Sequence, residues 1–215
     1  MSFGIAVHET IKDILNDDLL DIKSNFQKKF KHELKRLPAQ FKSQIVTDKR
    51  TKETVQDMMN KGESLCLASI KQLHIDFPGF KVISAEGKLI EPIKEYVSKL
   101  FEFKGYIDLI LVTPDEQIII LDWKTTSWGW DVKKKSDKII SYQLVYYKHF
   151  ISQQFGIDPE KIKTFFALIK RTAKKDNIEI FETVVGKKKI ENSLKVLNGM
   201  LYNIEHKNFP KNKLG

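Results

Sequence analysis

The chain has 215 residues, of which 37 are Lys or Arg and 28 are Asp or Glu, so its formal net charge is +9 at pH 7. This basic balance favours a polyanionic partner such as nucleic acid, although a basic protein need not bind one. A single cysteine excludes a disulfide framework and favours a reducing compartment, and no apolar run approaches the ~18 residues of a membrane span. We therefore expect a soluble, cytoplasmic protein without a membrane partner.

Apolar periodicity predicts that the first third of the chain is helical. A first helix covers about residues 3–20 and places Gly4 and His8 on one stripe with apolar side chains. Residues 22–50 hold nine Lys or Arg against two acids, and their apolar residues recur every four positions until Pro38 interrupts the pattern. This basic stretch has two open interpretations, a solvated helix face or a surface that tracks DNA. A further helix is predicted from about Lys52 to His74.

The middle of the chain alternates between strand and turn signals. Strands are predicted near residues 80–86 and 88–93, joined by a hairpin through Glu86-Gly87-Lys88, and near 97–112 and 117–124. A helix from Ser136 to about Gln153, strands near 163–171 and 177–185 and a closing amphipathic helix complete the order. This order predicts an α/β fold with a central mixed β-sheet flanked by helices.

Two acids interrupt otherwise apolar strands. Asp122 ends the run that begins at Gln117, and Asp108 lies inside the strand before it. Strand side chains alternate between faces, so Asp122 and Lys124 point to the same side, and a turn at residues 113–116 brings both acids to one end of the sheet. Burial of such charges is costly unless they serve each other or a metal. The alternative is that Asp108 caps a loop and Asp122 forms an ordinary ion pair with Lys124.

Gln143 and Tyr147 lie four residues apart on the predicted helix and therefore share a face. An unpartnered amide on the apolar side of that helix would be costly, which favours a role at a polar site. The alternative is a tyrosine that packs in the core and a glutamine at the surface.

These residues together resemble a known family. The order Gly105-x-x-Asp108, Asp122-x-Lys124-Thr125 and Gln143-x-x-x-Tyr147 resembles the PD-(D/E)XK nuclease superfamily, in particular its RecB-like branch. Gly4-x-x-x-His8 is similar to the motif of an upstream helix in that branch, and Glu86 to a glutamate on its first strand. The resemblance covers about residues 3–15 and 80–150.

The resemblance implies a restriction-endonuclease-like core with an N-terminal helical insertion. We expect one nuclease domain over residues 1–215, with a basic helical insertion at 20–78, the catalytic sheet and motif helix at 79–185, and a C-terminal helix at 186–207. It also implies a metal-dependent DNase that uses Mg²⁺ or Mn²⁺, with the ligands His8, Asp108, Asp122 and the carbonyl of Trp123. The residues expected to act in catalysis are Asp108, Asp122, Lys124, Gln143, Tyr147 and Glu86. Because Cys66 is the only cysteine, the four-cysteine iron–sulfur cluster of some relatives is not expected.

Side chains near these motifs are candidates for contacts with nucleic acid. The candidates are Thr125, Trp128, Trp130, Lys133, Lys134, Lys135, Lys170 and Arg171. An indole beside a cleavage site can stack on a base, which is worth ~1–3 kcal/mol. The competing interpretation is that both indoles pack beneath the motif helix.

The function expected from this set is an exonuclease that acts on DNA ends or single strands and leaves 5′-phosphates. The biological setting would be DNA recombination, repair, replication or phage DNA processing. The alternatives are a structure-specific endonuclease that cuts flaps or junctions, a non-catalytic DNA-binding module that retains the fold, and a scaffold protein that is basic for other reasons.

Overall fold

The computed structural model describes residues 2–17 and 21–209. Its elements, in chain order, are α1 (Ser2–Leu15), α2 (Ile22–Lys35), α3 (Ala39–Thr47), α4 (Lys49–Asp76), β1 (Lys81–Pro92), β2 (Glu102–Val112), β3 (Ile118–Thr126), α5 (Val132–Lys135), α6 (Lys138–Phe155), a 3₁₀ turn (Pro159–Lys161), β4 (Ile162–Lys170), β5 (Ile178–Glu182) and α7 (Lys187–Glu205). The predicted α/β fold with a mixed sheet and flanking helices is confirmed. No helix of the described residues is both long and apolar enough to cross a bilayer.

The sheet has the strand order β1-β2-β3-β4-β5, and only the central β3–β4 pair is parallel. The crossover between these two strands contains α6, as a parallel connection requires. Alternation along β3 follows the predicted period of two. Leu121 and Trp123 enter the core on one face, whereas Ile120 enters the core on the other.

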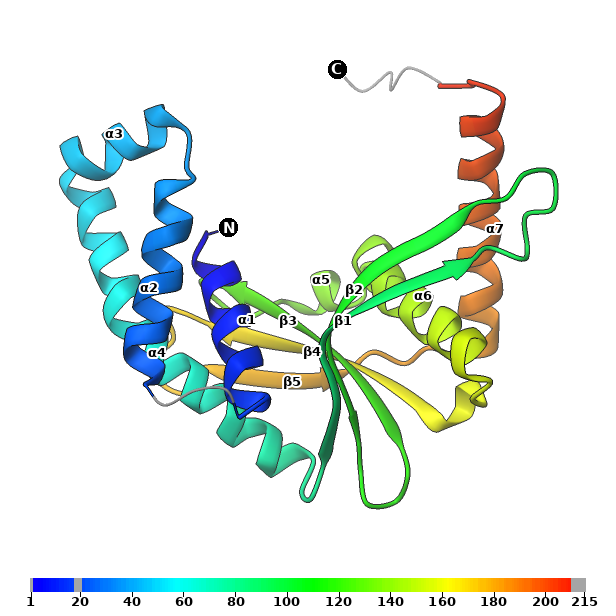
Figure 1. Cartoon of the computed structure of the whole chain (residues 1–215), viewed down its shortest axis with the longest axis horizontal. Helices are drawn as coiled ribbons and strands as arrows, with labels where there is room; N and C mark the ends of the chain where they lie inside the picture. Colours follow the sequence, from blue (N-terminus) through cyan, green and yellow to red (C-terminus); the bar gives the residue numbers. More distant parts are fainter. Residues whose placement is uncertain (1, 18–20, 210–215) are drawn as a thin grey trace.

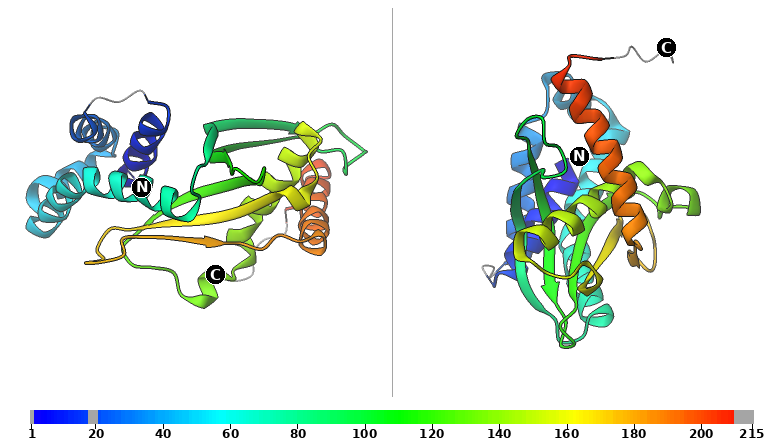
Figure 2. Two further views of the ribbon diagram at one scale, coloured as in Figure 1. Left: turned by 90° about the horizontal axis from the view of Figure 1, so that it is seen from below. Right: turned by 90° about the vertical axis from the view of Figure 1, so that its right-hand side faces the viewer.

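Helices cover the two faces of the sheet separately. Figure 1 shows α1 to α4 on one side of the molecule and α6 with α7 on the other, and the views in Figure 2 agree. Phe26 and Phe30 of α2 are fully buried in the first core, and Phe150 of α6 is fully buried with Phe166 of β4 in the second. The sheet is therefore the partition between two apolar layers, and polar groups at its centre are shielded from both sides.

The predicted hairpin at Glu86-Gly87-Lys88 is wrong. β1 runs without a turn from Lys81 to Pro92, and its pairing with β2 continues on both sides of Glu86, from Ala85↔Leu109 to Gly87↔Ile107. Instead of reversing the chain at Gly87, the strand is distorted locally, because Glu86 has a φ of +56°. A single residue in this conformation bends a strand without reversing it.

Several boundaries differ from the prediction for local reasons. The first helix ends at Leu15, and residues 18–20 of its expected range lie outside the described residues. The basic stretch breaks at Pro38, as predicted, into α2 and α3. β2 begins only at Glu102, and in the segment before it Tyr96 and Ser98 donate hydrogen bonds to Glu205 of α7. The assignment of one domain with a helical insertion stays a prediction.

Candidate active site

The ladder between β2 and β3 ends at the pair Leu109↔Leu121, and the acids lie just beyond it. There the backbone N–H of Trp123 donates to Oδ2 of Asp108 at 2.7 Å in place of a strand partner. In an extended strand the N–H and C=O of one residue point to the same side, so the Trp123 carbonyl faces this gap too. The gap between β2 and β3 lets side chains from both faces of the sheet approach the acids.

Asp122 is 1% exposed and is the centre of a polar network. Nε2 of Gln143 donates to its Oδ1 at 2.7 Å, and the ammonium of Lys124 lies 2.6 Å from its Oδ2. The ammonium therefore pairs with Oδ2 of Asp122, and it also donates to Oε1 of Gln143 at 3.0 Å. The ordinary ion pair considered from sequence is present, but it is one side of a three-residue network.

Tyr147 joins this network to β2. Its hydroxyl accepts from Gln143 at 3.1 Å and donates to the carbonyl of Tyr106 at 2.6 Å. A Cβ atom on Gly105 would lie 2.6 Å from Cε1 of the Tyr147 ring. Glycine is therefore required at the start of the Gly105-x-x-Asp108 segment so that the tyrosine of α6 can reach the strand.

His8 approaches from the opposite face of the sheet, on α1. Its Nδ1 lies 3.7 Å from Oδ2 of Asp108, and its Nε2 is buried without a hydrogen-bond partner among the described residues. A Cβ atom on Gly4 would lie 2.6 Å from Oγ1 of Thr125 on β3. The missing side chain lets α1 lie against β3, and this contact sets the position of the imidazole one turn later.

Glu86 lies beside the same cluster but is paired. Lys12 of α1 donates to its Oε2 at 3.1 Å, and its charge acts on both His8 and Asp108. Lys12 was not among the residues singled out from the sequence. The available signal was its spacing, because it follows His8 by four residues and therefore lies on the same helix face.

The surroundings shift the pKa values of the three side chains expected to bind the metal. Burial raises the pKa of Asp108 to about 6, although the Trp123 N–H and Lys124 oppose this shift. Burial and the nearby charge of Asp108 raise the pKa of Asp122 to about 6. Burial lowers the pKa of His8 to about 4. Above pH 6 the site therefore holds a neutral imidazole and two ionised carboxylates, which are the forms that bind a metal ion.

The donor types fit a hard divalent cation. One imidazole, two carboxylates and a backbone carbonyl suit Mn²⁺ and are compatible with Mg²⁺. The buried Nε2 of His8, which has no hydrogen-bond partner among the described residues, agrees with such a role. Within residues 2–17 and 21–209, however, no three His, Cys, Asp or Glu side chains are grouped closely enough to form a ready metal centre. The Trp123 N–H binds one oxygen of Asp108, whereas Gln143 and the Lys124 ammonium contact the two oxygens of Asp122.

The two indoles of the loop after β3 have different environments. Trp128 is 69% exposed. Trp130 packs against Phe166 with ring centroids 5.3 Å apart, and Lys134 lies over its ring at 4.9 Å. A base can therefore stack on Trp128, whereas Trp130 packs on Phe166 of β4 and Phe181 of β5.

Some of the basic residues expected to contact nucleic acid have partners among the described residues of the protein, and others do not. Lys135 and Lys170 both pair with Glu179, and Arg171 donates to Oγ of Ser127 at 3.0 Å. These contacts hold the loop that follows β3. Lys133 is exposed and remains a candidate for contact with phosphate.

Comparisons with known proteins give a family and a fold. A sequence profile of the PD-(D/E)XK nuclease superfamily matches residues 1–213. Among solved structures, a protein of Eubacterium rectale provisionally described as an exonuclease is similar, with a TM-score of 0.53 and 13% identity over 98% of this chain and 70% of that chain. A second structure, SSO0001, reaches a TM-score of only 0.39 at 15% identity, over 92% of this chain and 84% of that chain, and supports no argument. No curated protein sequence matches.

Proposed function

This chain belongs to the PD-(D/E)XK nuclease superfamily, and on that premise we propose that it is a Mg²⁺- or Mn²⁺-dependent deoxyribonuclease of the RecB-like branch. It hydrolyses phosphodiester bonds at DNA ends or in single strands and leaves 5′-phosphates. The observation that carries this proposal is the network of Asp122, Lys124 and Gln143, with Asp108 and His8 beside it.

The residues proposed to hold the cation are His8, Asp108, Asp122 and the carbonyl of Trp123. A divalent cation there supplies Lewis acidity toward the phosphate and lowers the pKa of a water molecule. The chain itself orients the ligands. Gln143 holds the Asp122 carboxylate, and the Trp123 N–H holds that of Asp108.

Lys124 is proposed to act on the substrate. Its side chain is 32% exposed, so the ammonium is accessible from solvent even though Asp122 and Gln143 hold it. A positioned ammonium is a point charge that can donate to a phosphate oxygen and offset the charge that develops there. Gln143 is thus a positioning residue for both Lys124 and Asp122.

The preference for ends or single strands is supported by the exposed Trp128. Its indole follows directly on the strand that carries Asp122 and Lys124, so an unpaired base near the site can stack on it. The description of the Eubacterium rectale protein as a suspected exonuclease agrees with this preference.

One cleavage assay tests the proposal. End-labelled linear DNA and circular single-stranded DNA are incubated with Mn²⁺ or with a chelator. The proteins compared are the wild type, Lys124→Ala and a control, Lys163→Ala, whose exposed lysine is the second residue of β4, at the far end of the sheet. We expect metal-dependent degradation of linear DNA by the wild type and the control, and none by Lys124→Ala, which should still bind DNA. Retained turnover in purified Lys124→Ala would refute the assignment. Cleavage of the circular single-stranded DNA would contradict an exonuclease and favour the alternative, a structure-specific endonuclease.

A further inference from the structure

A groove of about 660 Å³ lies between the first turn of α6 and the first half of α7. The residues that line it are Ser136, Lys138, Tyr142, Lys188, Lys189, Asn192 and Val196. Three of these seven are lysines, and none of the described residues that line the groove is acidic. No ion pair of Lys138, Lys188 or Lys189 occurs among the described residues. The groove is therefore a concentrated positive surface that the protein itself does not neutralise.

The start of α7 adds to this positive potential. Residues 187–189 are all lysines, and the N-cap is Gly186, which makes no side-chain capping hydrogen bond. The helix dipole and the free N–H groups of a first turn favour anions and disfavour cations. Helices α2, α4, α5 and α6 begin at aspartate caps, whereas α3, which begins after Pro38, has no side-chain cap either. The lysines at α7 oppose the helix dipole, and a bound anion would relieve this repulsion.

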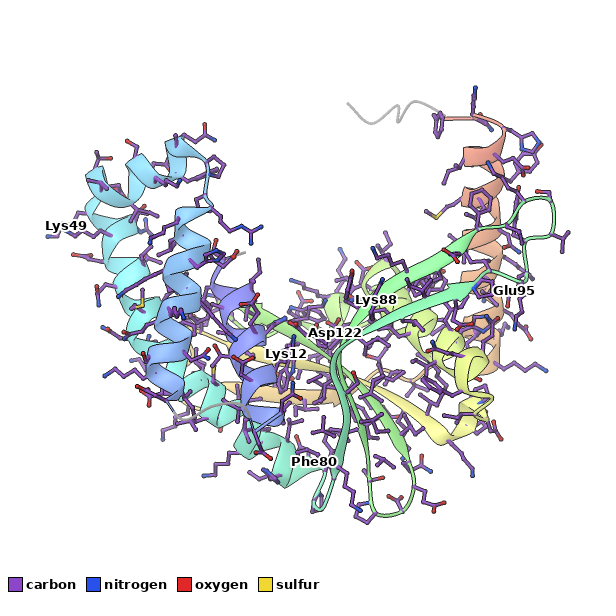
Figure 3. All side chains as sticks on the ribbon, in the orientation of Figure 1. Lys12, Lys49, Phe80, Lys88, Glu95 and Asp122 are labelled. Atoms are coloured by element: carbon purple, nitrogen blue, oxygen red, sulfur yellow. The ribbon has the colours of Figure 1, made fainter. Side chains whose placement is uncertain are left out.

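α6 connects the groove to the candidate active site. Lys138 and Tyr142 share one face of this helix, and Gln143 and Tyr147 share another that is turned by about 100° from it. Gln143 binds the Asp122 carboxylate, while the adjacent Tyr142 lines the groove with its half-buried ring. In Figure 3, Asp122 lies near the middle of the molecule, between α1 and the side that carries α6 and α7. α6 therefore carries both a residue of the groove, Tyr142, and the next residue in the sequence, Gln143, which belongs to the network at the site.

We propose that the groove between α6 and α7 binds the phosphodiester backbone of a single-stranded DNA segment that flanks the bond held at the active site. Lys138, Lys188 and Lys189 contact successive phosphates, and Tyr142 offers a ring to a base or sugar. This inference rests on the proposed function in that the ligand is the substrate. The contacts themselves need neither the metal nor the cleavage reaction.

The test measures binding in chelator, so that no cleavage occurs. The affinity of fluorescent single-stranded oligonucleotides of increasing length is measured against salt for the wild type and the triple variant Lys138→Gln, Lys188→Gln, Lys189→Gln. The control carries Lys81→Gln, Lys161→Gln and Lys163→Gln. These changes lower the net charge by the same amount as the groove variant does, but at the end of the sheet where Val112, Ile118 and Ile162 lie in register. All six lysines are exposed or half-buried, so both variants should keep the fold, which thermal unfolding checks.

We expect the groove variant to lose on the order of tenfold in affinity for long oligonucleotides, with a log–log salt slope shallower by about 2, since each lost single-strand phosphate contact contributes about 0.7. Its affinity for the shortest oligonucleotide that binds should be unchanged, and the control should match the wild type. Equal slopes for groove variant and control would overturn the proposal. Competition by polyglutamate as effective as by DNA would also overturn it, in favour of an acidic peptide. Retained cleavage by Lys124→Ala would refute the proposed function without altering these binding results, so the two failures are distinguishable.

Discussion

Gly4 lies so close to Thr125 that a methyl group at position 4 would be 2.6 Å from the threonine hydroxyl oxygen. This contact is the point at which α1 rests on β3, the strand that carries Asp122 and Lys124. The imidazole of His8 is one turn along the helix from it. The placement of a proposed metal ligand therefore depends on a glycine that has no side chain of its own to contribute to the site.

Gly4→Ala should displace α1 and with it His8. We expect weaker binding of Mn²⁺ and a free energy of unfolding lower by about 1–3 kcal/mol, the usual cost of overpacking. Calorimetric titration and urea denaturation measure the two effects. The control is Gly199→Ala, because a Cβ atom there meets open space and alanine favours the helix by about 1 kcal/mol. Unchanged metal binding in Gly4→Ala would show that the position of His8 does not depend on this contact.

Gly105→Ala should destabilise the protein because its Cβ would collide with the Tyr147 ring. We expect a cost of about 1–3 kcal/mol in the wild-type background. In the Tyr147→Ala background the same change should cost much less, since the ring is gone. A double-mutant cycle by urea denaturation measures this coupling. Equal costs in both backgrounds would mean that another contact of Gly105 is responsible.

Gln143→Leu should lower kcat of the proposed nuclease about 10- to 100-fold, as is typical when a residue that orients metal ligands is lost. The change removes the donor to Asp122 and the acceptor for Lys124 together. KM for DNA should stay nearly constant, because the amide is not placed to carry the substrate. The matched control is Gln153→Leu on the same helix, whose amide donates to Glu91 and the Pro92 carbonyl. A pure rise in KM would contradict the positioning role.

The two tryptophans after β3 should respond in opposite ways to alanine. Trp128→Ala should weaken binding of single-stranded DNA by ~1–3 kcal/mol and leave the melting temperature unchanged, because the indole is exposed. Trp130→Ala should lower the free energy of unfolding by on the order of 3 kcal/mol, because its ring packs on Phe166 and Phe181. Fluorescence anisotropy and thermal unfolding of both variants test this. Equal DNA affinities for Trp128→Ala and wild type would remove the stacking role.

Binding of the divalent cation should strengthen as the pH rises through about 6. The pKa values of Asp108 and Asp122 are both raised to about 6, so below that pH protons compete for the carboxylates. His8, with its pKa lowered to about 4, stays neutral throughout this range. Calorimetry at pH 5.5 and 7.5, in buffers of different ionisation enthalpy, measures the affinity and the protons released. An affinity that is flat across this range would contradict binding through these two acids.

Much of the fold was predictable because it depends on local sequence. The β-branched run Ile118–Ile120 and the strand period of two place Asp122 and Lys124 on one side, and helical spacing pairs Gln143 with Tyr147. The hairpin at Glu86 was predicted wrongly because a glycine beside a charged residue signals a turn. Whether such a signal becomes a turn or a bend in a strand depends on the partner strand, which here continues past it.

The sequence by itself therefore determined most of the order of the elements and the shared sides of Asp122 with Lys124 and of Gln143 with Tyr147. The tertiary structure alone decided which residues meet: Gly4 with Thr125, Gly105 with Tyr147, Lys12 with Glu86, and the lysines of α7 with Tyr142. It also separated the exposed Trp128 from the packed Trp130. The physical reason is that periodicity and turn chemistry act between neighbours along the chain, whereas these contacts arise only when the two apolar layers close on the sheet.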